Sequence, residues 1–203
     1  MNHIPQPTVD DITGVILAGG KGRRINGQDK GLLSFNGKPL IEYVIDSLRP
    51  QVKTLLINAN RNIDQYQQFG YPVIQDTITG YCGPLAGVAS GIEHAETTLI
   101  VTAPCDCPSP PADLVERLLK RLQTTNATVS VAHDGERLQP MFALLTQAVY
   151  SGLVSYLNNS GRRVDRWYEQ QSMAITDFSD VPQAFNNINT INDIDALNKD
   201  QAG

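Results

Sequence analysis

Four basic side chains and a run of small residues lie close together near the start of the chain. Lys21, Arg23, Arg24 and Lys30 follow the sequence Ala-Gly-Gly at 18–20. Small residues let a ligand approach backbone N–H groups, and the cations add positive charge at the same place. This combination suits a polyphosphate. A strand followed by a solvated basic loop is the alternative interpretation of the same residues.

Two familiar phosphate-binding motifs are absent from this segment. A Walker A loop would place Lys-Ser or Lys-Thr after its second glycine, but Gln28 and Asp29 follow Gly27. The dinucleotide fingerprint G-x-G-x-x-G fails because Ile25 stands where its third glycine belongs. The loop therefore predicts a nucleotide site of another kind.

The composition of the 203-residue chain is that of one globular domain. A net charge of −5 argues against a general nucleic-acid binder, which needs an excess of basic surface. Cys82, Cys105 and Cys107 lack the spacing of a zinc site, so we interpret them as reduced thiols of a cytoplasmic protein. Residues 1–10 lack the apolar core of a signal peptide and are expected to be a disordered tail. No apolar run approaches the length of a membrane span.

The elements that must position the basic loop can be predicted from apolar periodicity and turn residues. Tight turns are expected at Asn36-Gly37 and Asp134-Gly135. The expected strands are 12–17, 53–58, 71–74, 98–102, 128–132, 138–145 and 173–178, and the expected helices are 39–48, 60–70, 83–96, 111–122, 147–157, 162–170 and 191–198, with 185–189 extended. Residues 11–203 are therefore expected to form a single-domain, Rossmann-like α/β fold with a doubly wound, mostly parallel sheet.

Candidate ligand-binding residues lie at the ends of four of these strands. Ligands of doubly wound sheets bind beyond the carboxyl ends of the strands, so the loops there should border one crevice. Those loops carry Gly19, Asn58, Asp76 and Asp106. We therefore expect the nucleotide site at this edge of the sheet.

Asp106 is the candidate metal ligand at that edge. It is held between Pro104 and Pro108, and a rigid carboxylate suits Mg²⁺, which takes few protein ligands and phosphate oxygens for the rest. A turn-capping aspartate is the alternative interpretation. Asp76 is a candidate second ligand or base reader, and Lys30 is suited to a phosphate oxygen. No constellation of His or Ser indicates a protein nucleophile.

With these residues in view, the chain resembles the molybdenum cofactor guanylyltransferases, within the nucleotidyltransferase family. The sequence LAGG at 17–20, Arg24 and Asp29-Lys30 are similar to the family signature LAGGxxxRxGxDK. Residues 83–87, 104–106, 162–163 and 187–190 also match in order and spacing, so the resemblance covers Ile12 to about Leu197. Asn26, where the family often has glycine, and Cys82, before the segment GPLAG, are departures from the pattern.

The resemblance implies transfer of GMP from GTP to the terminal phosphate of molybdenum-molybdopterin, with release of pyrophosphate. A phosphomonoester is largely deprotonated near neutral pH, so its attack requires no general base. The resemblance implies that Lys30, Asp106 and Arg24 are catalytic and that Asp106 holds Mg²⁺. It implies GTP binding by Leu17, Ala18, Gly19, Gly20, Lys30, Asn58, Asp76 and Asp106, in the N-terminal part of the domain. It implies molybdopterin binding by Arg24, Gly27, Gly83, Gly87, Arg163, Asn187 and Asn189, with a contribution from the C-terminal part.

The implied partners are these two substrates. Apo-molybdoenzymes, their chaperones and the upstream molybdate-insertion protein are further candidates, and neither nucleic acid nor a membrane is expected. A cytidylyltransferase or sugar-phosphate nucleotidyltransferase of the same fold is one alternative, although Gly20 resembles the GTP-using branch rather than the LAAG of cytidine-using relatives. A GTP- or pterin-binding carrier is another. Lys30 and Asp106 together favour an enzyme, because binding alone requires no metal at the α-phosphate.

Overall fold

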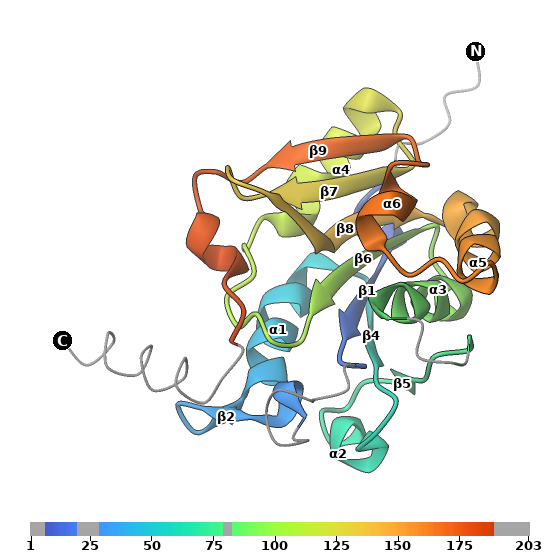
Figure 1. Cartoon of the computed structure of the whole chain (residues 1–203). Helices are drawn as coiled ribbons and strands as arrows, with labels where there is room; N and C mark the ends of the chain where they lie inside the picture. The colour runs from blue at the N-terminus through green and yellow to red at the C-terminus, as the bar shows by residue number, and fades with distance from the viewer. Residues whose placement is uncertain (1–6, 20–28, 79–82, 189–203) are drawn as a thin grey trace.

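A seven-stranded sheet forms the centre of the computed structural model, which describes residues 7–19, 29–78 and 83–188 (Figure 1). Its strand order is β5-β4-β1-β6-β8-β7-β9. The strands are β1 Ile12–Leu17, β4 Thr54–Asn58, β5 Val73–Ile74, β6 Leu99–Pro104, β7 Val129–His133, β8 Leu138–Thr146 and β9 Met173–Asp177. Only β8 runs antiparallel to its neighbours, β6 and β7. The expected mostly parallel sheet is confirmed.

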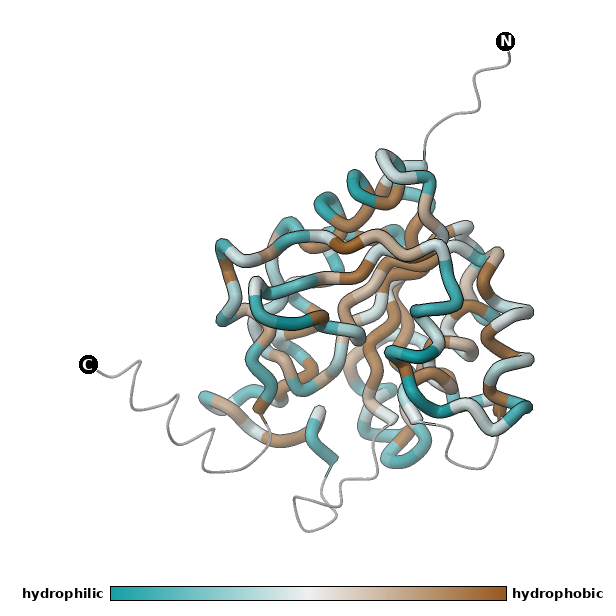
Figure 2. The backbone as a smooth tube through the Cα atoms, turned by 45° about the horizontal axis from the view of Figure 1, so that its top comes forward, coloured by the Kyte–Doolittle hydropathy of each residue, from teal (hydrophilic) through white to brown (hydrophobic). Residues whose placement is uncertain are grey.

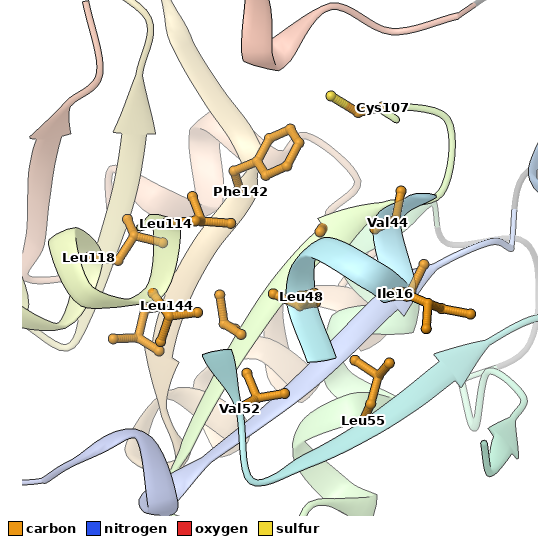
Figure 3. Packing of buried hydrophobic residues seen from close by; sticks show 14 of the residues in the cluster. Ile16, Val44, Leu48, Val52, Leu55, Cys107, Leu114, Leu118, Phe142 and Leu144 are labelled. Carbon is orange, nitrogen blue, oxygen red and sulfur yellow. The ribbon is translucent and has the colours of Figure 1, made fainter. Parts of the chain in front are cut away.

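Helices cover both faces of this sheet, as a doubly wound fold requires. The helices α1 (Leu40–Leu48) and α4 (Leu114–Thr125) pack on one face, around Ile16 and Leu144 (Figure 3). On the other face lie α3 (Pro84–His94), α5 (Tyr150–Asn158) and α6 (Val164–Tyr168). Neighbouring residues of a strand point to opposite faces, so both faces need apolar side chains, and β1 and β6 are buried along most of their length. Figure 2 shows the hydrophobic residues gathered in these central strands.

A small hairpin of β2 (Ser34–Phe35) and β3 (Lys38–Pro39) precedes α1. Its turn residues Asn36 and Gly37 have φ of 49° and 77°, which confirms the tight turn expected there. Pro39 then directly precedes the first residue of α1. The described helices include none that is long and apolar enough to cross a membrane.

Most elements have bounds that differ by one to three residues from those expected, and two of the differences have a clear physical reason. β6 continues beyond Thr102 to Pro104, because both residues at its end still pair with β1. The helix expected at 60–70 is confined to α2 (Ile63–Gln67), because Asn62 adopts the left-handed conformation directly before it. Of the tail expected to be disordered, the structure describes residues 7–10, and Val9–Asp11 form a 3₁₀ turn. Residues 1–6 and the expected helix 191–198 lie outside the described residues.

Candidate active site

The loops after β1, β4, β5 and β6 border one cleft of about 800 Å³, which confirms the crevice expected at this edge. Of the residues implied by the resemblance, the cleft brings together Leu17, Ala18, Gly19, Lys30, Asn58, Asp76, Gly83, Asp106 and Asn187. Gly87 and Arg163 do not line it. Gly20, Arg24, Gly27 and Asn189 lie outside the described residues.

Lys30 and Asp106 form an ion pair in this cleft, with 2.7 Å between Nζ and Oδ2. Their side chains are 24% and 14% exposed, so solvent screens the pair only in part. The loop that carries Asp106 is held by backbone hydrogen bonds: the Cys105 N–H donates to the Leu17 carbonyl at 3.2 Å, and the Ile188 N–H donates to the Asp106 carbonyl at 2.8 Å. The cation and the carboxylate thus meet at the end of β6, in a fixed position.

Asp76 follows β5 and is held by two asparagine side chains, one at the end of β4 and one two residues beyond it. Asn58 Nδ2 donates to Asp76 Oδ1 at 3.0 Å, and Asn60 Nδ2 donates to Asp76 Oδ2 at 2.8 Å. The Asp76 N–H in turn donates to Asn60 Oδ1 at 2.9 Å. Asn60 was missed by the sequence analysis, although a polar residue two positions beyond a strand-end asparagine is a signal that both point the same way.

Two glycines leave room for the Asn58 side chain. A Cβ at Gly87 would lie 2.3 Å from Asn58 Oδ1, and a Cβ at Gly19 would lie 3.2 Å from the same atom. Gly87 is buried in α3, behind Asn58 and outside the cleft. The structure therefore places Gly87 against a residue of the implied GTP site, whereas the resemblance implies that it contacts molybdopterin.

A second, buried carboxylate fixes the segment that carries Lys30. Asp29 is 6% exposed and accepts hydrogen bonds from Tyr66 Oη at 2.6 Å and Asn62 Nδ2 at 3.3 Å. Arg61 Nε lies 3.3 Å from the same carboxylate. Burial raises the pKa of Tyr66 well above its usual value, so its hydroxyl stays a donor. These partners of Asp29 come from the region of α2, and no local pattern in the sequence indicates the contact.

The wall of the cleft on the far side of β6 was also missed by the sequence analysis. It consists of residues 137–142, at the start of β8, which we call the β8 wall. Pro140 within an apolar run was the available signal, because proline in a strand marks an edge or a bulge.

Arg163 directly precedes α6 and does not line the cleft. Its side chain is 64% exposed and forms an ion pair with Asp165. The neighbouring Arg162 donates to the Leu157 carbonyl at 2.8 Å, at the end of α5. Arg162 therefore stabilises the end of a helix, and the implied contact between Arg163 and molybdopterin stays a prediction.

The cleft contains one carboxylate that could serve as a magnesium ligand, that of Asp106. Mg²⁺ takes one or two carboxylates together with substrate phosphates, and Asp106 offers a carboxylate whose neighbour is a lysine. Both carboxylate oxygens of Asp76 and of Asp29 already accept hydrogen bonds or contact a cation. Asp106 therefore fits Mg²⁺ better than either of them.

The two described cysteines do not fit a soft-metal site. Burial raises the pKa of Cys105, and it raises the pKa of Cys107 to about 12, so both thiols stay protonated and ligate poorly. Among the described residues, no group of three or more His, Cys, Asp or Glu side chains is placed to hold a metal. Both cysteines belong to the apolar core.

This chain is similar to known proteins in both sequence and fold. Residues 14–174 match the family model of the MobA-like NTP transferase domain. A curated molybdenum cofactor guanylyltransferase from Shewanella sediminis is 46% identical over 179 residues, which cover 88% of this chain and 91% of that protein. Another from Shewanella putrefaciens is 43% identical over 190 residues, with 94% and 97% covered. The crystal structure of molybdopterin-guanine dinucleotide biosynthesis protein A from Archaeoglobus fulgidus has the same fold, with a TM-score of 0.75 at 20% identity over 94% of this chain and 98% of that one. This chain is a nucleotidyltransferase that belongs to the MobA-like NTP transferase family.

Proposed function

We propose that the enzyme transfers GMP from GTP to the terminal phosphate of molybdenum-molybdopterin and releases pyrophosphate. The observation that carries the proposal is the ion pair between Lys30 and Asp106, both of which line the cleft. The names of the relatives from Shewanella support the choice of substrates.

The ion pair suits a reaction at a phosphorus atom. Lys30 is a point charge that can bind a phosphate oxygen, and Asp106 would hold the magnesium ion. When bound, Mg²⁺ neutralises charge on the triphosphate and on the departing pyrophosphate. The attacking phosphate is already deprotonated near neutral pH, so the protein has to align the two substrates rather than remove a proton.

The asparagine and aspartate side chains at β4 and β5 support guanine as the base. Asn58, Asn60 and Asp76 hold one another in a fixed arrangement that combines amide donors with carbonyl and carboxylate acceptors. A site built to hydrogen-bond one base edge rejects a base that leaves its polar groups unpaired. We therefore propose that this group selects GTP over CTP and ATP.

Pyrophosphate release tests the proposal. The purified enzyme is assayed with equal concentrations of GTP, CTP or ATP, with and without molybdopterin, and with Mg²⁺ or excess chelator. We expect release only with GTP, acceptor and Mg²⁺ together. Equal or better use of CTP would make the enzyme a cytidylyltransferase, and binding of both ligands without pyrophosphate release would make it a carrier.

A further inference from the structure

We propose that the β8 wall is the acceptor subsite, where Arg137, Pro140 and Met141 hold a flat heterocycle that carries a phosphomonoester. This inference rests on the proposed function, because it assigns the second substrate of that reaction to a place in the cleft. None of these three residues belongs to the set that the resemblance implies.

The strand order divides the cleft into two halves. Asn58 and Asp76 follow β4 and β5, on one side of β1, whereas the β8 wall lies on the other side of β6. Asp106 follows β6 itself and therefore lies between the two halves. Three inter-strand spacings of about 4.8 Å separate β4 from β8, or roughly 14 Å. A nucleotide with its base over β4 and its phosphates at Lys30 leaves the β8 wall open to the acceptor.

A bulge shapes the β8 wall. Val131 of β7 pairs with Ala143, but the next residue of β7, Ala132, pairs with Gln139, so residues 140–142 intervene on β8. Bulges interrupt pairing and re-aim side chains, and they are common beside active sites. Here the interrupted residues line the cleft instead of continuing the ladder with β7.

Two buried hydroxyl groups hold the backbone of this bulge. Thr102 Oγ1 donates to the Met141 carbonyl at 2.8 Å, and Tyr168 Oη donates to the Pro140 carbonyl at 2.8 Å. Thr102 and Tyr168 are 0% and 2% exposed. Hydroxyls buried to this degree are costly unless they are hydrogen-bonded, so the bulge is a fixed part of the fold.

The turn before β8 fixes the backbone of Arg137. The Asp134 carboxylate accepts hydrogen bonds from the N–H groups of Arg137 at 2.8 Å and Glu136 at 2.9 Å, and from Gln139 Nε2 at 2.5 Å. These bonds, led by the one from Arg137, hold the pKa of Asp134 below its usual value. The Arg137 side chain is 78% exposed and lines the cleft, and its Nε lies 3.8 Å from Asp134 Oδ2. A guanidinium at this position can bind a phosphate through two hydrogen bonds, or it can stack on an aromatic ring.

A second line of evidence brings the implied acceptor residue Asn187 to the same wall. The ring of Phe142 packs edge-on against Phe185, with centroids 5.0 Å apart. From Phe185 the chain continues to Ile188, whose N–H donates to the Asp106 carbonyl. Asn187, which lies between them, lines the cleft. The resemblance and the β8 wall therefore indicate the same half of the cleft for the acceptor.

The two halves also differ in chemistry. The half at β4 and β5 presents amides and a carboxylate, whereas the β8 wall presents Leu138, Pro140 and Met141 beside one arginine. A thioether packs well on an aromatic ring, and the proline ring adds apolar C–H groups beside it. The β8 wall therefore suits a planar ring system with an anionic group.

Two substitutions in the full-length enzyme test the inference, Arg137→Ala and Met141→Ala. Glu136→Ala is the matched control, because it changes the same turn at a side chain that does not line the cleft. Pyrophosphate release is measured while molybdopterin or GTP is varied, and molybdopterin binding is measured separately by its fluorescence. We expect Arg137→Ala to raise the acceptor KM roughly tenfold or more, with the KM for GTP unchanged, and Arg137→Lys to recover part of the loss.

Each other outcome has a distinct meaning. A rise in the KM for GTP instead of the acceptor KM would show that the two halves are reversed. Unchanged KM values and unchanged molybdopterin binding in both variants would refute the acceptor subsite and leave the proposed function intact. If the parent enzyme transfers no nucleotide, the proposed function fails. The subsite would still be supported if the parent binds molybdopterin, as followed by the fluorescence of molybdopterin, and Arg137→Ala does not. Thermal melting identifies any variant that is merely unfolded, in which case Arg137→Lys decides.

Discussion

Gly87→Ala is the substitution whose effect the structure determines most closely. The added Cβ would lie 2.3 Å from Asn58 Oδ1 and 2.9 Å from Leu17 Cδ2. Carbon and oxygen do not approach so closely, so the Asn58 side chain must move by about 1 Å to restore an ordinary contact. That movement would disrupt its hydrogen bond to Asp76, which is now 3.0 Å long.

The expected loss follows from the strength of that hydrogen bond. A hydrogen bond to a charged group contributes about 1.5–3 kcal/mol, and 1.4 kcal/mol corresponds to a tenfold change in affinity. Because Asn58 belongs to the proposed GTP site, we expect the KM for GTP to rise roughly 10- to 100-fold. The acceptor KM should stay within about twofold, since Gly87 lies outside the cleft.

Gly152→Ala is the matched control for this experiment. Gly152 is also a helical glycine, but a Cβ there would meet nothing within 4 Å. This control should leave both KM values unchanged and should stabilise the protein by about 1 kcal/mol, because alanine is the better helix former. Thermal melting and steady-state kinetics on both variants make the comparison.

One result would refute the reasoning. If Gly87→Ala raised the acceptor KM and left the KM for GTP unchanged, Gly87 would act on molybdopterin, as the resemblance implies. A double-mutant cycle adds an internal check, because Gly87→Ala should have little further effect on the KM for GTP once Asn58→Ala has removed the obstructed side chain.

Three further predictions concern the proposed metal ligand Asp106, the exposed Arg163 and the buried thiol of Cys107. Asp106→Asn is nearly isosteric, so the variant should melt at the same temperature as the parent but lose about a hundredfold or more in kcat. Near-parental turnover across a Mg²⁺ titration would show that Asp106 does not bind the metal. Arg163→Ala should leave GTP affinity unchanged, because Arg163 is paired with Asp165 outside the cleft; loss of affinity in a titration with GTP alone would contradict this. Burial raises the pKa of Cys107 to about 12, so on the order of one thiol in 10⁴ is ionised at pH 8. Mass spectrometry should therefore find Cys107 unmodified after iodoacetamide treatment of the native protein and alkylated in urea, and rapid native alkylation would argue against the burial.

Local patterns predicted the elements well where the chain itself marks their ends. β1 has its expected bounds, because an apolar run stops at a string of small residues. α1 starts after Pro39 and stops at Arg49 and Pro50 for the same kind of reason. Strand order could not be predicted from local patterns, because it depends on partners far apart in sequence. Nothing in the apolar run of β8 indicates that it lies between β6 and β7.

The residues of the site also fall into those that the sequence could predict and those that depend on contacts distant in sequence. Gly19, Asn58, Asp76 and Asp106 could be predicted to border one cleft, because the ends of parallel strands share one edge of the sheet. The contact of Asp29 with Tyr66 joins residues 37 positions apart and has no local signal. The bulge in β8 depends on hydroxyls from two other elements, so its shape could not be predicted from its own residues.

The antiparallel β8 also has a consequence for how the chain is made. The partners of β6 are β1, which precedes it, and β8, which is synthesised only after α4 and β7. Until β8 has left the ribosome, β6 exposes one unpaired apolar edge, although it is central in the finished sheet. Such edges favour association between chains. We therefore expect a chain that ends at Asn126 to aggregate and sediment. A chain that continues through Asp177 includes every strand and should stay in the supernatant. Equal solubility of the two chains would show that the edge of the nascent β6 is protected in another way.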